Sequence, residues 1–309
     1  MHSFTDLVPA FEERFTASLP FSQFPATLYE PCRYFLQLGG KRLRPVMCLM
    51  GNELFAEISE DAWHGAFGIE LFHNFTLIHD DIMDKAPLRR GKPTLHTKYD
   101  MTAGILCGDV MNIYAYDEIA KIKTALPLVL RAFNKTAMEV CEGQQLDMDF
   151  ERRNDVHIGE YLHMISLKTS VLLACSLKIG ALVSGAMGDN ANKLYAFGAN
   201  LGVAFQLQDD YLDAFGKTEL LGKQNGGDII ANKKTFLHLK AMELANAIAA
   251  NAPLAVWESR ALVIAADWDD EATINKNTAA AFGRVLSSED TTEGLTAFIE
   301  KRAPQWKGR

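Results

Sequence analysis

Two aspartate triads with the same spacing are the residues of this sequence best suited to chemistry. The first consists of Asp80, Asp81 and Asp84, and the second repeats its spacing as Asp209, Asp210 and Asp213. In a helix, positions i, i+1 and i+4 fall within an arc of about 100°, so each triad puts three carboxylates on one side. Two such charges about 4 Å apart repel by roughly 4 kcal/mol at an effective dielectric of 20. The repeat therefore predicts a cation bound between the triads.

The expected cation is Mg²⁺. Ligands that are all oxygen suit a hard ion, and Mg²⁺ combines a few carboxylates with waters and substrate phosphates. Acidic residues can also mark solvated helix ends, but that alternative explains one such motif more readily than two embedded in apolar helices. The expected metal ligands are Asp80, Asp81, Asp84, Asp209, Asp210 and Asp213.

Cations near the triads would balance the charge of phosphates bound through the metal. The segment GGKRLRP at 39–45 places Lys41, Arg42 and Arg44 at a loop-to-helix junction. Pro45 is favoured in a first helical turn, whose free N–H groups attract anions. Taken one at a time, such residues are more often solvated surface positions, and only their joint placement beside the triads favours phosphate binding.

Three further basic motifs accompany the triads. RRG at 89–91 follows the first triad closely enough to fold back over it. Lys168 and Thr169 lie in an apolar stretch, where a buried ammonium needs an anionic partner. Gly222-Lys223 and Lys233-Lys234 bracket a Gly-rich loop after the second triad.

In this order, the motifs resemble those of the trans-prenyltransferases (polyprenyl diphosphate synthases) over essentially the whole chain. The resemblance rests on GGKRLRP at 39–45, HDDIMD at 79–84, RRG at 89–91, KT at 168–169, FQLQDDYLD at 205–213 and GK at 222–223. It implies an all-α bundle of long, mostly antiparallel helices around a deep cavity, assembled as a homodimer. It also implies a Mg²⁺-dependent transferase that condenses isopentenyl diphosphate with an allylic diphosphate (dimethylallyl, geranyl or farnesyl) into a linear trans-prenyl diphosphate.

The resemblance also implies a role for each matching residue. Isopentenyl diphosphate would be held by Lys41, Arg44, His73 and Arg90, and the allylic diphosphate by Arg89, Lys168, Lys223 and Lys233. Gln206 and the backbone near Thr169 would stabilise the allylic cation. Where many relatives have Gly-Lys-Thr or Gly-Lys-Ser, this chain has Asn232-Lys233-Lys234-Thr235, and Lys233 is the expected phosphate contact. The implied catalytic residues are Asp80, Asp81, Asp84, Lys168, Thr169, Gln206 and Asp209.

Product length is expected to depend on Phe72, Phe75 and Thr76. In the family resembled, an aromatic residue five positions before the first triad forms the cavity floor, and Phe75 occupies that position. This favours geranylgeranyl diphosphate, with farnesyl or longer products as alternatives. Ideal helix geometry is less favourable, because Phe75 lies about 140° around the helix from Asp80 and Thr76 only about 40°.

Helical periodicity dominates the chain and supports a single all-α domain over residues 1–309. The prolines within the first 45 residues indicate a loosely organised N-terminal part. The expected helices are Trp63–Met83, Met101–Ala120, Ala125–Asp149, Val156–Gly185, Asn190–Phe215, Lys233–Asn251 and a segment from about Glu271.

Composition limits the partners and the compartment. The 309 residues are 48% hydrophobic and 23% charged, as in an ordinary globular protein, and the net charge of −8 disfavours nucleic acid and anionic membranes. No signal peptide and no stretch of transmembrane length are expected. The five cysteines share no CxxC spacing and predict reduced thiols in a cytoplasmic protein.

Three alternative functions stay open at this point. His73 and the pair His79-Asp80 would suit an HD-type metal phosphohydrolase, which leaves the second triad and GGKRLRP without roles. A terpene cyclase would share the helical cavity but would carry a different second metal motif. A non-catalytic partner subunit would be expected to have lost some of the aspartates.

Overall fold

The computed structural model describes residues 1–186, 189–216, 227–230 and 232–309. Within them the protein is helical apart from one antiparallel hairpin of two short strands, β1 (Leu88–Arg89) and β2 (Lys92–Pro93). These residues form two compact units, Met1–Phe236 and Leu237–Arg309. The all-α prediction is confirmed. The single domain over residues 1–309 stays a prediction.

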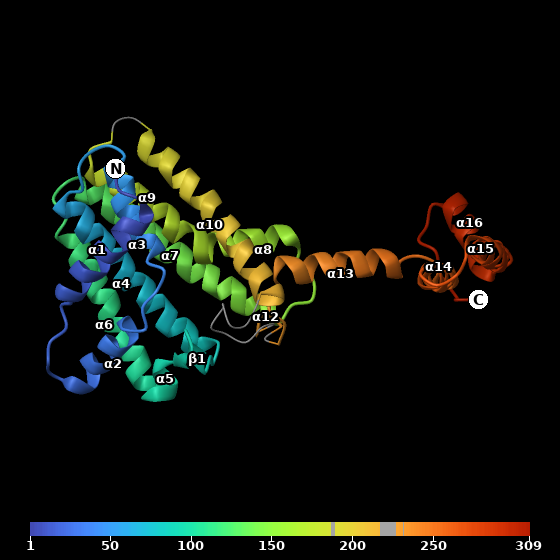
Figure 1. The fold of residues 1–309 in the computed structure, drawn as a ribbon, viewed down its shortest axis with the longest axis horizontal. Coiled ribbons are helices and arrows are strands. Elements are labelled where there is room, and N and C mark those ends of the chain that lie inside the picture. The colour runs from blue at the N-terminus through green and yellow to red at the C-terminus, as the bar shows by residue number, and fades with distance from the viewer. Residues whose placement is uncertain (187–188, 217–226, 231) are drawn as a thin grey trace. The chain divides into compact units, whose positions relative to one another are not determined.

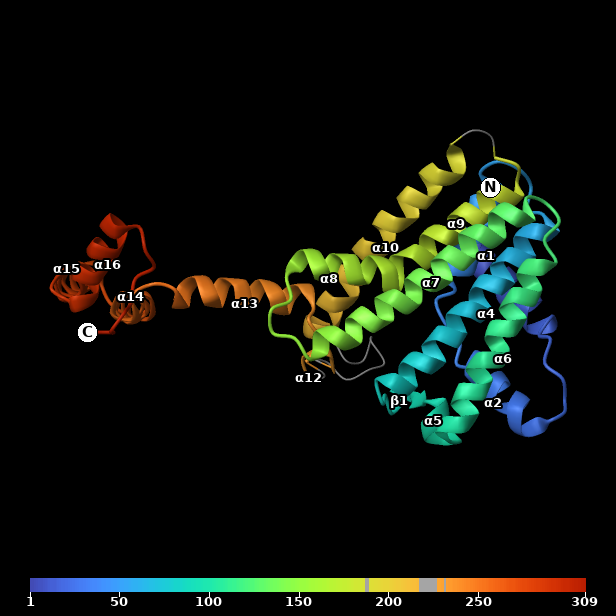
Figure 2. The same ribbon diagram turned by 180° about the vertical axis from the view of Figure 1, so that it is seen from behind.

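The first unit is a bundle of long helices that run side by side (Figures 1 and 2). In chain order, its helices are α1 (Phe4–Ala17), α2 (Ala26–Leu36), α3 (Leu43–Glu53), α4 (Glu60–Met83), α5 (Leu95–Lys98), α6 (Met101–Ala120), α7 (Leu126–Glu151), α8 (Ile158–Ile165), the π-helical turn η1 (Ser166–Ser170), α9 (Val171–Val183), α10 (Asn190–Phe215) and α12 (Gly227–Ile230). The prediction for α6 and α10 matches their bounds, and the other long helices differ by a few residues at their ends.

Two helices, α4 and α9, form the centre of this bundle. Helix α4 packs against α3 and α6, and α9 packs against α3, α7 and α10. Helix α4 begins at Ser59, whose side chain accepts a hydrogen bond from the N–H of Ala62, and it buries residues on most of its sides. A helix that is apolar nearly all round has to be enclosed by other helices. The position of the first triad, at the end of α4, therefore follows from the core.

The prediction of a loosely organised N-terminal part, which was based on its prolines, is wrong. The prolines Pro9 and Pro31 stand inside regular helices, α1 and α2. An interior proline removes a helical hydrogen bond. Here Phe11 and Phe35 are fully buried in the main core, and such burial contributes about 1.5–3 kcal/mol per large side chain, enough to offset much of the loss.

The continuous helical run Ile158–Val183 has the length and mean hydropathy (1.5) of a membrane span, which the sequence analysis did not expect. However, 67% of the most apolar window is buried inside the protein. Neighbouring helices α3, α7 and α10 cover this run, so its apolar character is explained by its place in the core of the bundle.

The second unit consists of α13 (Phe236–Ala249), which begins at the boundary, α14 (Pro253–Ala265), α15 (Glu271–Leu286) and α16 (Glu289–Glu300). Helix α14 was not predicted as a separate element. Arg284 on α15 donates two 2.6 Å hydrogen bonds to Glu258 on α14. The buried carboxylate of Asp290 accepts the backbone N–H groups of Lys307 and Gly308 and ties down the C-terminal residues.

Candidate active site

Within the first triad, Asp81 is buried and paired with Arg89. Its carboxylate is 1% exposed and accepts Arg89 Nε at 2.9 Å on both oxygens, with Nη2 at 2.8 Å. Burial raises the pKa of Asp81, and the guanidinium opposes this rise. The hairpin therefore does fold back over the triad, as expected, and Arg89 makes the contact.

The other two aspartates of the first triad face a group of lysines. Burial and the nearby charge of Asp84 raise the pKa of Asp80 to about 6, although Lys168 and Lys233 oppose the rise. Asp84 caps the end of α4 and lies 3.5 Å from Lys233 Nζ. Both carboxylates thus point into a region where positive charge gathers.

Glycines on two neighbouring helices position Lys168 and Thr169. Both residues lie in η1, a π-helical turn between α8 and α9. A Cβ atom on Gly143 of α7 would lie 2.3 Å from the backbone nitrogen of Lys168. A Cβ atom on Gly202 of α10 would lie 2.5 Å from the Cα atom of Ser170. Only glycine permits such close packing. Two helices therefore press on this turn from different sides, and π-turns are frequent at functional sites.

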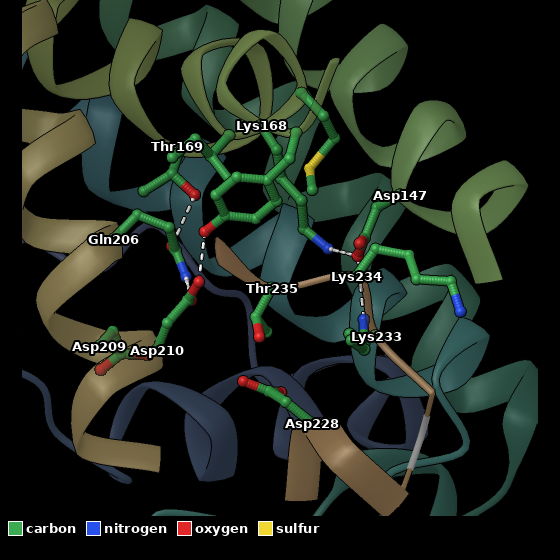
Figure 3. A pocket seen from close by; sticks show the side chains of 13 residues that line it. Asp147, Lys168, Thr169, Gln206, Asp209, Asp210, Asp228, Lys233, Lys234 and Thr235 are labelled. Carbon is green, nitrogen blue, oxygen red and sulfur yellow. Dashed lines mark hydrogen bonds and ion pairs between the residues drawn. The ribbon is translucent and has the colours of Figure 1, made fainter. Parts of the chain in front are cut away.

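Asp147, which the sequence analysis missed, holds two of the expected phosphate-binding lysines. Its carboxylate accepts Lys168 Nζ at 2.7 Å and Lys233 Nζ at 2.9 Å (Figure 3). Burial would raise the pKa of Asp147, but the two ammonium charges outweigh it and lower the pKa. The sequence spacing could have indicated that Asp147 is buried, because it lies on the same face of α7 as the buried residues Val140 and Gly143.

In the second triad, the three carboxylates have different surroundings. Asp209 is half-buried and lines the cavity, whereas Asp210 is 5% exposed and accepts hydrogen bonds from Tyr161 and from Gln206 Nε2. Asp213 is 3% exposed and accepts the backbone N–H of Asp228 at 3.1 Å. Tyr161 and Asp228 were not anticipated, since a single tyrosine or aspartate carries no spacing signal.

A cavity of about 160 Å³ is lined by Asp209 and Asp210 of the second triad together with the two lysines that pair with Asp147 (Figure 3). The side chain of Lys233 reaches Asp147 and Asp84, whereas Lys234 donates to Asn232 Oδ1 at 2.8 Å. Gly222 and Lys223 lie outside the described residues. The residues that line the cavity are Asp147, Tyr161, Met164, Ile165, Lys168, Thr169, Gln206, Asp209, Asp210, Asp228, Lys233, Lys234 and Thr235.

Beside α4, a second basic region brings together the expected isopentenyl diphosphate residues. Arg44 Nη1 lies 3.1 Å from His73 Nε2. Burial and the charge of Arg44 lower the pKa of His73 well below its ordinary value, so the neutral ring accepts this hydrogen bond. Burial also lowers the pKa of Arg44 to about 10, although Glu70 opposes the fall. Arg44 keeps a buried Nε without a partner among the described residues.

Arg90 lies near His73 in this region, Lys41 lies beside Phe205 of α10, and Arg42 has a structural role. The guanidinium of Arg90 lies against Gly40, where a Cβ would come within 3.0 Å of Nη2. The ammonium of Lys41 lies 5.2 Å from the centre of the Phe205 ring. Arg42 is buried and ion-paired with Glu12 and Glu70, which makes it structural.

Two of the expected chain-length residues, Phe72 and Phe75, belong to an aromatic cluster with Phe133 of α7 and with His79, whereas Thr76 donates its hydroxyl to the His73 carbonyl oxygen at 2.8 Å. Phe72 contacts Phe75 and Phe133 with ring centroids 5.5 and 5.2 Å apart. Phe75 also packs on His79 at 4.8 Å, and His79 Nε2 lies 3.2 Å from the Ile105 carbonyl oxygen of α6. Phe75 therefore shares the side of α4 that faces α6, as ideal helix geometry indicates.

The residues present fit a divalent cation. No preformed group of three or more metal-ligating side chains occurs among the described residues. Asp80 nevertheless has a pKa of about 6 because burial and Asp84 penalise its ionised form, and a bound cation would relieve that penalty. Asp80 and Asp84 lie near Lys168 and Lys233, and Asp209 lines the cavity, so these three carboxylates could hold a metal.

Comparison with known proteins gives one consistent result. The polyprenyl synthetase family model matches residues 25–259. The geranylgeranyl diphosphate synthase of Methanosarcina mazei is 42% identical over 222 residues, which cover 71% of this chain and 68% of the relative.

Solved structures agree with the family match. A crystal structure of a geranylgeranyl pyrophosphate synthase superposes with a TM-score of 0.76 at 41% identity, over 97% of this chain and 91% of the other. A geranyltransferase from Helicobacter pylori, solved with magnesium and isoprenyl diphosphate, has a TM-score of 0.67 at 26% identity, over 93% and 99%. Since the matched residues make up most of its length, this chain belongs to the polyprenyl synthetase family.

Proposed function

We propose that this protein condenses isopentenyl diphosphate with an allylic diphosphate, in the presence of Mg²⁺, to make geranylgeranyl diphosphate. The observation that carries the proposal is the convergence of Lys168 and Lys233 on Asp147, beside the carboxylates of both triads. Cations and carboxylates so close together suit a metal diphosphate, whose charges can pair with both. The names of the relatives with about 40% identity support the same reaction.

The first chemical step breaks the allylic C–O bond, and the electron pair leaves with diphosphate. When bound, Mg²⁺ supplies positive charge that stabilises this leaving group. Asp80, Asp84 and Asp209 would hold the metal, and Lys168 and Lys233 would add hydrogen bonds and charge to the departing oxygens. Asp147 keeps both ammonium groups in place through a hydrogen bond from each.

The second step joins the two substrates. The double bond of isopentenyl diphosphate, held through Arg44, Arg90 and Lys41, attacks the allylic cation and forms a carbon–carbon bond. A proton then leaves the new chain, and the departed diphosphate is the base within reach. Thr169 and Gln206, which line the cavity, present oxygen atoms that stabilise the cation meanwhile.

The HD-type phosphohydrolase receives no support from the geometry. His73 pairs with Arg44, and His79 points to the Ile105 carbonyl oxygen on α6, so the histidines do not converge with Asp80 on one ion. A non-catalytic subunit would not need the lysine and aspartate arrangement of the cavity.

A homodimer fits the surface of α6. Its exposed apolar side chains Leu106 and Ile113 line a groove of about 500 Å³ together with Leu28 and Val110. We propose that a second copy covers this face. The cytoplasm is the proposed location, because the five cysteines are free thiols and four of them are buried.

Incubation of the purified protein with isopentenyl and dimethylallyl diphosphates tests the function. A synthase should release a twenty-carbon linear diphosphate when Mg²⁺ is present and none when it is chelated. A cyclic hydrocarbon, or hydrolysis without chain growth, would contradict the proposal. Sedimentation velocity of wild type and Ile113→Glu tests the dimer, which the substitution should dissociate.

A further inference from the structure

Hydrogen bonds link Tyr161 to Asp210, Asp210 to Gln206 and Gln206 to Thr169, and all four residues line the cavity. Figure 3 labels the last three of them. Tyr161 donates its hydroxyl to Asp210 Oδ2, and Gln206 Nε2 donates to Asp210 Oδ1 at 3.0 Å. Gln206 Oε1 accepts the hydroxyl of Thr169 at 3.1 Å. The four residues come from α8, α10 and η1, so these hydrogen bonds join elements that are distant in sequence.

The direction of each hydrogen bond follows from the chemistry of Asp210. An ionised carboxylate only accepts hydrogen bonds. It therefore selects the Nε2 end of the Gln206 amide, and the carbonyl oxygen Oε1 is left directed at Thr169. The backbone N–H of Phe236 also donates to Asp210. With both carboxylate oxygens engaged and the residue 5% exposed, Asp210 is anchored to the protein by donors on three sides.

Tyr161 is the buried end of this series of hydrogen bonds, and its side chain is held in one position. Its side chain is 2% exposed. Burial and the hydrogen bond to Asp210 raise the pKa of Tyr161, so its hydroxyl remains protonated and donates. Tyr161 cannot exchange this partner for water without leaving the core.

We propose that Asp210 and Tyr161 are positioning residues for Gln206, and that they hold the carbonyl oxygen of the Gln206 amide toward the allylic carbon instead of binding the metal. This role rests on the proposed prenyl transfer. An amide oxygen carries partial negative charge and stabilises a nearby carbocation, whereas the amide NH₂ group in its place would repel it. Asp210 and Tyr161 therefore help to stabilise the carbocation that forms when the C–O bond breaks, and they contribute little to the binding of the two diphosphates.

The first test is Tyr161→Phe, which removes one hydroxyl and keeps the ring. Loss of a hydrogen bond to a charged group should lower kcat by about tenfold or more, while KM for both diphosphates stays at the wild-type value. Tyr211→Phe is the matched control, since Tyr211 lies on α10 beside Asp210 but is 55% exposed, and it should behave as wild type. A wild-type kcat for Tyr161→Phe would overturn the proposal.

The second test separates positioning from metal binding without measuring turnover. Mn²⁺ binding in the presence of inorganic diphosphate is followed by electron paramagnetic resonance for Asp209→Asn and Asp210→Asn. The proposal expects Asp209→Asn to weaken Mn²⁺ binding and Asp210→Asn to retain it while kcat falls. Loss of Mn²⁺ binding in Asp210→Asn equal to that in Asp209→Asn would make Asp210 a metal ligand and overturn the proposal.

These outcomes are distinct from failure of the proposed function. If wild type formed no longer prenyl diphosphate, the reaction itself would be wrong. If wild type formed it and Tyr161→Phe did so at the same rate, only the positioning role would be wrong. Thermal unfolding of each variant shows that the comparison is made between folded proteins.

Discussion

The ammonium of Lys233 lies 3.5 Å from the carboxylate of Asp84, although 149 residues separate them in the sequence. The same Nζ atom is 2.9 Å from Asp147. Burial lowers the pKa of Lys233, but the charges of Asp147 and Asp84 outweigh it and raise the pKa. Lys233, which follows the second triad in the sequence, therefore connects that segment to Asp84 of the first triad.

Asp80→Ala should reduce turnover by about two orders of magnitude or more, because loss of a group that stabilises the leaving diphosphate commonly costs about 3 kcal/mol or more. The metal-free protein should melt at the wild-type temperature or above it, since the substitution also removes repulsion with Asp84. Steady-state kinetics and calorimetry check both expectations. Asp109→Asn, an exposed position on α6, is the control. Near-normal turnover of Asp80→Ala would disprove its assignment as a metal ligand.

Divalent cation binding should weaken as the pH falls through about 6. The pKa of Asp80 is raised to about 6 by burial and by Asp84, so the carboxylate is present above that pH and protonated below it. Mn²⁺ titrations with inorganic diphosphate, at several pH values on either side, measure the effect. Asp80→Asn should show a flatter profile than wild type, and identical profiles would rule out Asp80 as the group that titrates.

Arg44→Ala and Lys168→Ala should affect different substrates. Arg44 lies beside His73 in the region assigned to isopentenyl diphosphate, whereas Lys168 lies with Asp147 and Lys233. We expect Arg44→Ala to raise KM mainly for isopentenyl diphosphate, and Lys168→Ala to raise KM for the allylic substrate or lower kcat. Initial rates with each substrate varied in turn distinguish these effects. Equal changes for both substrates in both variants would remove the basis for two sites.

Asp147→Asn should destabilise the ligand-free protein by about 1–3 kcal/mol, because two partly buried ammonium groups lose the charge of the carboxylate to which both donate hydrogen bonds. Thermal unfolding measures the loss. Inorganic diphosphate should restore more stability to this variant than to wild type, since the ligand replaces the missing negative charge. Asp149→Asn is the control: this residue is exposed, lies two positions further along α7, accepts a hydrogen bond from Gln145, and its substitution should leave the stability at the wild-type value.

Phe75→Ala should lengthen the product by at least one isoprene unit, if Phe75 is the floor of the elongation cavity. Chromatography of the products measures the distribution. Phe197→Ala, an exposed position on α10, should leave it unchanged. An unaltered distribution for Phe75→Ala would show that the floor lies elsewhere, and Phe72→Leu would then test the next ring of the cluster, which is 2% exposed.

The sequence by itself determined the helical class, the bounds of α6 and α10, and the two aspartate triads with their accompanying cations. These are local properties. Periodicity within one helix predicts which face is buried, and the spacing of a motif predicts which side chains share that face. Prolines misled the prediction for α1 and α2, because burial of Phe11 and Phe35 is a tertiary effect.

Only the tertiary structure decided what each charged residue does. Arg89 and Arg90 are adjacent in the sequence, but in the structure Arg89 pairs with Asp81 and Arg90 lies against Gly40. The tertiary structure paired Asp147 with Lys233, 86 residues away, and it occupied both oxygens of the buried Asp210, whereas the neighbouring Asp209 is half-buried at the cavity. The physical reason is that a side chain's charge, pKa and partners depend on groups brought near it by packing, and no spacing within a single helix contains that information.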